Sequence, residues 1–143
     1  MLIELCLALT IYHEARGEPL EGQRAVAEVV LNRVAHSSFP DDVCGVVKDP
    51  YQFSYVSNGW AQIPDSDAGW ATAVDVASEA IANFSDGRSY FGDKNMLWYH
   101  RSDIKTKWSE CLDKKMTIGE HTFFSDYQTV KVSLRPRPRP VSS

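Results

Sequence analysis

Two segments with the pattern of buried helices are separated by a short turn that is crowded with ionisable groups. Residues 1–12 are almost wholly apolar, and the spacing of three or four expected of a buried helical face is kept by Leu2, Leu5, Leu9 and Tyr12. The helical period returns at residues 25–34, after Pro19 and Glu21, which favour the start of a helix. Between them, His13 to Glu18 contains two carboxylates, an imidazole and a guanidinium. The chain must therefore place a charged turn where two core helices meet.

Glu14 is the candidate catalytic group in this turn. It is predicted to lie at the C-terminal end of the first helix, partly removed from water and facing the negative end of the helix dipole. Both effects favour the neutral, protonated form of a carboxyl group, so Glu14 can act as a general acid. For Arg16 we expect an ion pair with Glu18 or Glu21 that fixes the turn, with contact to a substrate carboxylate as the alternative.

Composition indicates one domain followed by a tail. A chain of 143 residues with 43% hydrophobic and 11% aromatic residues can build one core. We place the domain at residues 1–131 and a disordered Arg/Pro tail at residues 132–143. Without the three tail arginines, 12 basic residues oppose 19 acidic ones, a net charge of −7. This charge argues against nucleic acid as a ligand. A membrane span needs about 18 apolar residues in a row, and no apolar run of the chain is that long.

The cysteines favour a reducing compartment. Cys6, Cys44 and Cys111 are odd in number and widely spaced, with no CxxC pair, so we expect neither a disulfide framework nor a zinc ribbon. The apolar start has Glu4 in place of the basic residues of a signal peptide. We therefore expect synthesis in the cytoplasm without a signal peptide.

The remaining pattern predicts an α+β domain. The second helix should end near residue 35 or 36, and a third should begin at Asp65–Asp67 and stop at Ser85. Short apolar or alternating segments complete the chain: an apolar turn at Val43–Val47, a strand or hairpin arm at Tyr51–Tyr55, a strand at Met96–His100, and a hairpin of Lys115–Ile118 with His121–Phe124 around Gly119 and Glu120.

Several of these motifs, taken in order, resemble one known family. They read HEARGEPLEGQRAVAEVVLNRV (His13 to Val34), FPDDVCGVV (Phe39 to Val47), QFS (Gln52 to Ser54), WYH (Trp98 to His100) and IGEHTFF (Ile118 to Phe124). The series is similar to the cell wall hydrolase family of the spore-cortex lytic enzyme SleB. The resemblance implies a lysozyme-like α+β fold, in which a helical core and a small strand-rich subdomain form a groove. It also implies cleavage of peptidoglycan glycan strands, with Glu14 as the catalytic acid; family members are generally regarded as lytic transglycosylases.

The number of catalytic carboxylates separates two reactions. A hydrolase needs a second carboxylate, to attack the sugar or to activate water. Glu18 is the nearest in sequence, and an exposed or helix-capping role is as plausible for it as a catalytic one. A transglycosylase needs no second carboxylate, because the 6-hydroxyl of muramic acid attacks internally and gives a 1,6-anhydro product. The single well-placed acid favours transglycosylation, with a hydrolytic muramidase as the alternative.

The expected glycan contacts are Gln52, Ser54, Tyr55, Tyr99 and His121. Gln52 and Ser54 suit N-acetyl groups, although the solvated side of a strand gives the same pattern. Tyr55 and Tyr99 suit sugar stacking, although most tyrosines of this kind belong to a core. His13 and Glu14 do not form the HExxH pattern of zinc peptidases, and we expect no metal and no cofactor. Cys44 reads as a small buried residue and not as the nucleophile of a thiol amidase.

The combined expectation is a monomeric enzyme that cleaves between N-acetylmuramic acid and N-acetylglucosamine. The alternative from another class is a non-catalytic peptidoglycan-binding module. The expected setting is a bacteriophage endolysin that reaches the cell wall after release, for example through a holin.

Overall fold

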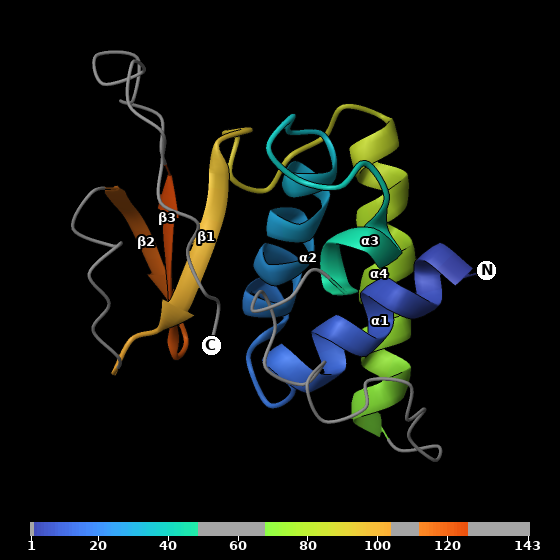
Figure 1. Ribbon diagram of the computed structural model, residues 1–143. Helices are drawn as coiled ribbons and strands as arrows, with labels where there is room; N and C mark the ends of the chain where they lie inside the picture. The colour runs from blue at the N-terminus through green and yellow to red at the C-terminus, as the bar shows by residue number, and fades with distance from the viewer. Residues whose placement is uncertain (1, 49–67, 104–111, 126–143) are drawn as a thin grey trace.

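The computed structural model describes residues 2–48, 68–103 and 112–125, and Figure 1 shows a helical layer beside a small sheet. The elements in these ranges are α1 (Leu2–Ala15), α2 (Leu20–Val34), α3 (Val43–Lys48), α4 (Ala68–Ser85), β1 (Met96–Arg101), β2 (Asp113–Ile118) and β3 (His121–Ser125). The predicted strand at Tyr51–Tyr55 and the predicted tail lie outside the described residues.

Helix α2 is the central element of the helical layer. It packs against α1, α3 and α4 and also against β1, so it lies between the other helices and the sheet (Figure 1). Its buried side includes Ala25, Val26, Val29 and Val30, each with no exposed surface. These are residues of the predicted helical period, and burial of such a face supplies most of the stability of a helix in a folded protein. The sequence prediction for α2 is confirmed at both ends, since Pro19 is its N-cap and Ala35 its C-cap.

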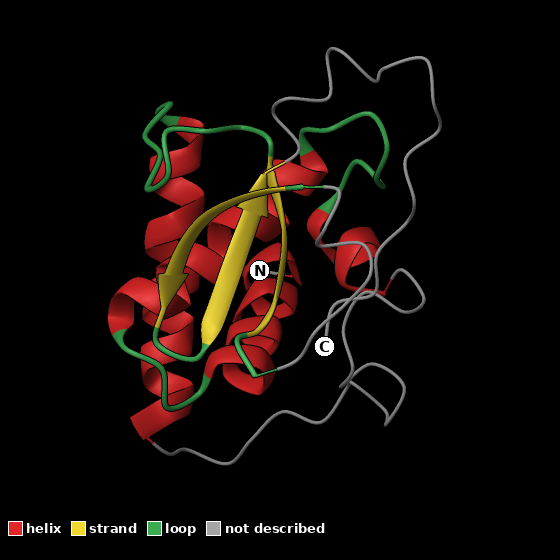
Figure 2. Ribbon diagram, turned by 90° about the vertical axis from the view of Figure 1, so that its left-hand side faces the viewer, coloured by secondary structure: helices red, strands yellow, loops and turns green. Residues whose placement is uncertain are grey.

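The sheet has three antiparallel strands in the order β1-β3-β2, so β3 is central (Figure 2). The predicted hairpin is confirmed: β2 pairs with β3 across Gly119 and Glu120, with Ile118 opposite His121. On the other edge of β3, Tyr99 of β1 lies opposite Phe123, and Arg101 opposite His121. This register puts Tyr99 and His121, distant in sequence, on neighbouring strands.

Arg33 of α2 holds β1 in place. Arg33 has no exposed surface, and its Nε donates to the carbonyl of Leu97 at 2.7 Å. Its guanidinium carbon also lies 5.2 Å from the ring centre of Phe39 and 5.5 Å from that of Trp98. Buried backbone carbonyls require such donors, and a guanidinium over aromatic faces gains cation–π energy. The strand that carries Tyr99 is thus fixed to the central helix.

Residues 43–47 form a helix and not the predicted apolar turn. The side chain of Asp42 accepts a hydrogen bond from the N–H of Gly45 at 2.7 Å, and its carbonyl accepts one from Val46 at 3.0 Å. An aspartate that caps a helix in this way satisfies donors that would otherwise lack partners. Val43, Val46 and Val47 are then buried. The apolar pattern predicted burial correctly, but five residues were too few to reveal the helical period.

A disulfide links α1 to α3 and contradicts the sequence prediction. Cys6 and Cys44 are bonded, with Cα atoms 5.3 Å apart and a sequence separation of 38 positions. The expectation of no disulfide framework, and with it the argument for a reducing compartment, was wrong. The pairing arises because α1 packs against α3, a proximity that cysteine number and spacing cannot reveal. Cys44 is therefore half of a covalent link between helices.

None of the described helices is long and apolar enough to cross a membrane.

Candidate active site

Glu14 lies in the last turn of α1, where the sequence placed it, and its side chain is half buried. The chain then reverses direction: the N–H of Glu18 donates to the carbonyl of Ala15 at 3.0 Å, and Gly17 adopts a φ of +88°. A positive φ of this kind favours glycine, because other residues are strained there. Gly17 thus allows α1 to end directly after Glu14 and α2 to begin at Leu20.

Tyr99 reaches Glu14 from the sheet. Its hydroxyl donates to Oε1 of Glu14 at 3.0 Å, across 85 positions of sequence. The ring has no exposed surface and packs against Phe123 and His121, with ring centres 5.6 Å and 5.2 Å away. As placed, Tyr99 offers no exposed face for the predicted sugar stacking. Its polar end is instead directed at the candidate acid.

Arg16 does not make the predicted ion pair within the described residues. Its Nη1 donates to the hydroxyl of Tyr12, and its guanidinium carbon lies 4.6 Å from the centre of that ring. Tyr12 is one helical turn earlier, a spacing at which side chains on a helix meet, whereas Glu18 turns away to the sheet. Arg16 is exposed and lies over the Tyr12 ring, with no ion pair to Glu18 or Glu21.

Glu18 ties the turn between the helices to the β2–β3 hairpin. Its Oε1 accepts the N–H of Glu120 at 2.9 Å, and its side chain is only 11% exposed. The side chain of Gln23 donates to the carbonyl of the same residue at 3.2 Å. Glu18 is therefore not the exposed turn residue that one interpretation of the sequence described. In this arrangement its carboxylate is engaged by the hairpin.

The contact of Glu18 with the hairpin depends on Gly119. A substitution at Gly119 should therefore show how much this contact contributes to stability. Gly119 has a φ of +57°, and a Cβ on it would lie 2.1 Å from Oε1 of Glu18. We expect Gly119→Ala to lower the free energy of unfolding by about 2 kcal/mol, from backbone strain and displacement of the carboxylate. Urea denaturation measures the loss.

Gly87 provides the matched control. Its φ is +78°, but a Cβ there would meet no atom within 4 Å. Gly87→Ala should therefore lose only the strain contribution of about 1 kcal/mol. Equal losses in the two variants would mean that the contact of Glu18 with the hairpin adds nothing to stability.

His121 is buried beside Glu18 and is not an ion-pair partner at neutral pH. Its Nδ1 lies 3.8 Å from Oε1 of Glu18, too far for a hydrogen bond, and has no hydrogen-bond partner among the described residues. Burial lowers the pKa of His121, with Arg101 and His100 acting in the same direction, while Glu18 and Glu120 oppose the shift. The imidazole is therefore neutral at pH 7. Its predicted contact with glycan stays a prediction.

Other predicted glycan contacts fall outside the described part of the chain. Gln52, Ser54 and Tyr55 belong to residues 49–67, and their predicted role stays a prediction. In the described residues, no three His, Cys, Asp or Glu side chains lie close enough together to hold a metal ion.

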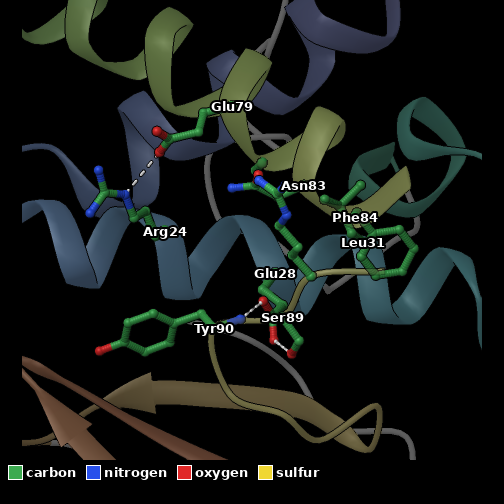
Figure 3. Close-up of a pocket in the computed structure, with 10 residues that line it drawn as sticks. Arg24, Glu28, Leu31, Glu79, Asn83, Phe84, Ser89 and Tyr90 are labelled. Carbon is green, nitrogen blue, oxygen red and sulfur yellow. Dashed lines mark hydrogen bonds and ion pairs between the residues drawn. The ribbon is translucent and has the colours of Figure 1, made fainter. Parts of the chain in front are cut away.

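A pocket of about 280 Å³ lies elsewhere, between α2, α4 and residues 88–90 (Figure 3). In its wall, Glu28 accepts hydrogen bonds from the Ser89 hydroxyl at 2.6 Å and from the N–H of Phe91 at 3.0 Å. Arg24 and Glu79 form an ion pair at 3.0 Å at the rim. Of the candidate site residues that the structure describes, neither Glu14 nor Tyr99 nor His121 lines this pocket. Glu28 serves to order the chain that leads into β1, a role that sequence reasoning missed because its partners Ser89 and Phe91 lie more than 60 positions away in sequence.

Comparison with known proteins identifies the family of this domain. The model of the Cell Wall Hydrolase family matches residues 17–124. The chain belongs to this family. The match begins three residues after Glu14, so the assignment of the acid rests on its structural position and on the EARGE motif.

Relatives of this cell wall hydrolase domain include spore cortex-lytic enzymes. That of Oceanobacillus iheyensis is 40% identical over 118 residues, which are 82% of this chain and 39% of the relative. That of Bacillus subtilis is 34% identical over 118 residues, 82% of this chain and 35% of the relative. The chain thus spans less than half the length of these curated relatives.

Solved structures give the same fold for the cell wall hydrolase domain. The catalytic domain of the germination-specific lytic transglycosylase SleB from Bacillus anthracis is 35% identical, with a TM-score of 0.70, and the match covers 85% of this chain and 93% of that one. The catalytic domain of Bacillus cereus SleB gives 35% identity and a TM-score of 0.71, over 87% and 91%. The predicted lysozyme-like α+β fold is confirmed.

Proposed function

We propose that this domain cleaves the glycan strands of peptidoglycan between N-acetylmuramic acid and N-acetylglucosamine, as a lytic transglycosylase with Glu14 as its general acid. The observation that carries the proposal is the position of Glu14. It is half buried at the end of α1, and its carboxyl group accepts a hydrogen bond from the hydroxyl of Tyr99 in the sheet. The likeness to SleB catalytic domains over more than nine tenths of their length supports it.

The proposed chemistry needs one carboxyl group with two successive roles. Protonated Glu14 gives its proton to the bridging oxygen, and the bond from that oxygen to the muramic acid anomeric carbon breaks. The 6-hydroxyl of the same sugar then forms a new bond to the anomeric carbon and returns its proton to Glu14. The products are a 1,6-anhydro-muramyl end and a free 4-hydroxyl on the other strand, with Glu14 regenerated.

Glu18 supports this choice over hydrolysis. A hydrolase requires a second free carboxylate, and that of Glu18 accepts a backbone hydrogen bond from Glu120. A carboxylate used to hold a hairpin is poorly placed to activate water at a sugar. The geometry therefore favours the internal nucleophile.

Product analysis tests the proposal. The purified protein is incubated with isolated peptidoglycan in water enriched in heavy oxygen, and the products are examined by mass spectrometry. We expect unlabelled anhydro-muramyl ends. Labelled reducing ends would identify a hydrolytic muramidase instead, and binding without any released muropeptide would identify a non-catalytic peptidoglycan-binding module.

Action outside the reducing cytoplasm also forms part of the proposal. It is supported by the Cys6–Cys44 disulfide, since such bonds persist mainly in oxidising surroundings. A monomeric state, and a role as a bacteriophage endolysin released through a holin, stay predictions from the sequence.

A further inference from the structure

The hydroxyl of Tyr99 is placed to control the proposed acid. Tyr99 is fully buried within β1, so its oxygen has a fixed position relative to the sheet. From there it donates to Oε1 of Glu14 at 3.0 Å. Glu14 itself lies in the last turn of α1, directly before the chain reverses direction. The sheet therefore supplies a restraint that α1 alone cannot provide.

The neighbours of Tyr99 connect it back to the same turn. His121 of β3 packs edge to face against the Tyr99 ring, with an interplanar angle of 83°. The preceding residue, Glu120, donates its N–H to Glu18, four positions after Glu14. The two carboxylate residues on either side of the turn are thus both attached to the sheet. Displacement of the hairpin would therefore also shift the Tyr99 ring, whose hydroxyl binds Glu14.

We infer that Tyr99 is a positioning residue for Glu14, kept in place by His121 and Glu18, and not a surface on which sugars stack. Its hydroxyl donates to Oε1 and so restrains the orientation of the Glu14 carboxyl group. A hydrogen bond donated to a carboxylate also favours its ionised form. Removal of the hydroxyl should therefore disturb both orientation and proton affinity. This inference rests on the proposed function of Glu14.

Tyr99→Phe tests the inference, because it removes one oxygen and retains the packed ring. We expect kcat for release of anhydro-muropeptides to fall by about 10- to 100-fold, as misplaced catalytic groups do, while KM changes less than about twofold. The alkaline limb of the pH profile of kcat/KM should move to higher pH, because the acid holds its proton more tightly without the donor. His121, which packs against the Tyr99 ring, and Glu18, which lies 3.8 Å from His121, are unchanged in the variant.

Tyr90→Phe is the matched control. Tyr90 is 40% exposed, and its hydroxyl contacts Glu21 at 3.2 Å, outside the proposed site. We expect wild-type kcat, KM and pH profile for this variant. Thermal unfolding of every variant should be compared, so that rates refer to folded protein.

Several results would overturn the inference. Unchanged kcat and pH profile in Tyr99→Phe would do so, and a lower kcat without movement of the alkaline limb would indicate a merely structural role. A higher KM with retained kcat would make Tyr99 a glycan contact. If Tyr99→Phe fails to fold, His121→Asn loosens the same ring, and unchanged kcat and pH profile there would also overturn the inference. A wild-type protein that releases no muropeptide would instead refute the proposed function itself.

Discussion

Glu14→Gln is expected to lower peptidoglycan cleavage by about 10³-fold or more while the fold is retained. The amide has the size of the carboxyl group and keeps an oxygen that can accept the hydroxyl of Tyr99. It cannot deliver a proton to the bridging oxygen, and general acid catalysis contributes about 10²- to 10⁴-fold to rates. The upper part of this range applies here because, in the proposed reaction, the same group also takes the proton from the attacking 6-hydroxyl.

Clearing of a suspension of isolated peptidoglycan, together with mass spectrometry of released muropeptides, measures this effect. Glu4→Gln is the control on the same helix, since Glu4 accepts a hydrogen bond from Ser78 at 3.0 Å at the other end of α1. It should retain wild-type activity. Full activity in Glu14→Gln would remove Glu14 as the acid and, with it, the basis for the role of Tyr99.

Loss of the Cys6–Cys44 disulfide is expected to lower the free energy of unfolding by about 3 kcal/mol. The link closes a loop across 38 positions of sequence, and cross-links of this span stabilise by about 2 to 4 kcal/mol, in one model by restricting the unfolded chain. For a single domain that is a large share of the total of about 5 to 15 kcal/mol. The double variant Cys6→Ala with Cys44→Ala removes the link and leaves small side chains.

Urea denaturation with and without reductant provides an internal control. Reductant should destabilise the wild type and leave the double variant unchanged. Thiol labelling of the denatured, unreduced wild type should modify one of the three cysteines. Reaction of all three, or an effect of reductant on the double variant equal to that on the wild type, would contradict the disulfide.

Much of the fold followed from local sequence patterns. The periods of α1, α2 and α4 identified these helices, and the strand-turn-strand pattern around Gly119 identified the β2–β3 hairpin, because each signal lies within one element. Helix α3 was missed because it contains only six residues and depends on the side chain of Asp42. The motifs from EARGE onward also identified the family.

The sequence by itself determined that a glutamate would end a buried helix beside a sharp turn, since periodicity, Gly17 and Pro19 are local and sufficient. It could not determine what holds that glutamate. Tyr99, Glu120 and His121 lie more than 80 residues beyond Glu14, and the pairing of Cys6 with Cys44 likewise joins separate helices. Such contacts depend on how the elements pack and on strand register, which place distant residues within bonding distance. The tertiary structure therefore decided that Glu18 holds the hairpin and that Tyr99 binds Glu14.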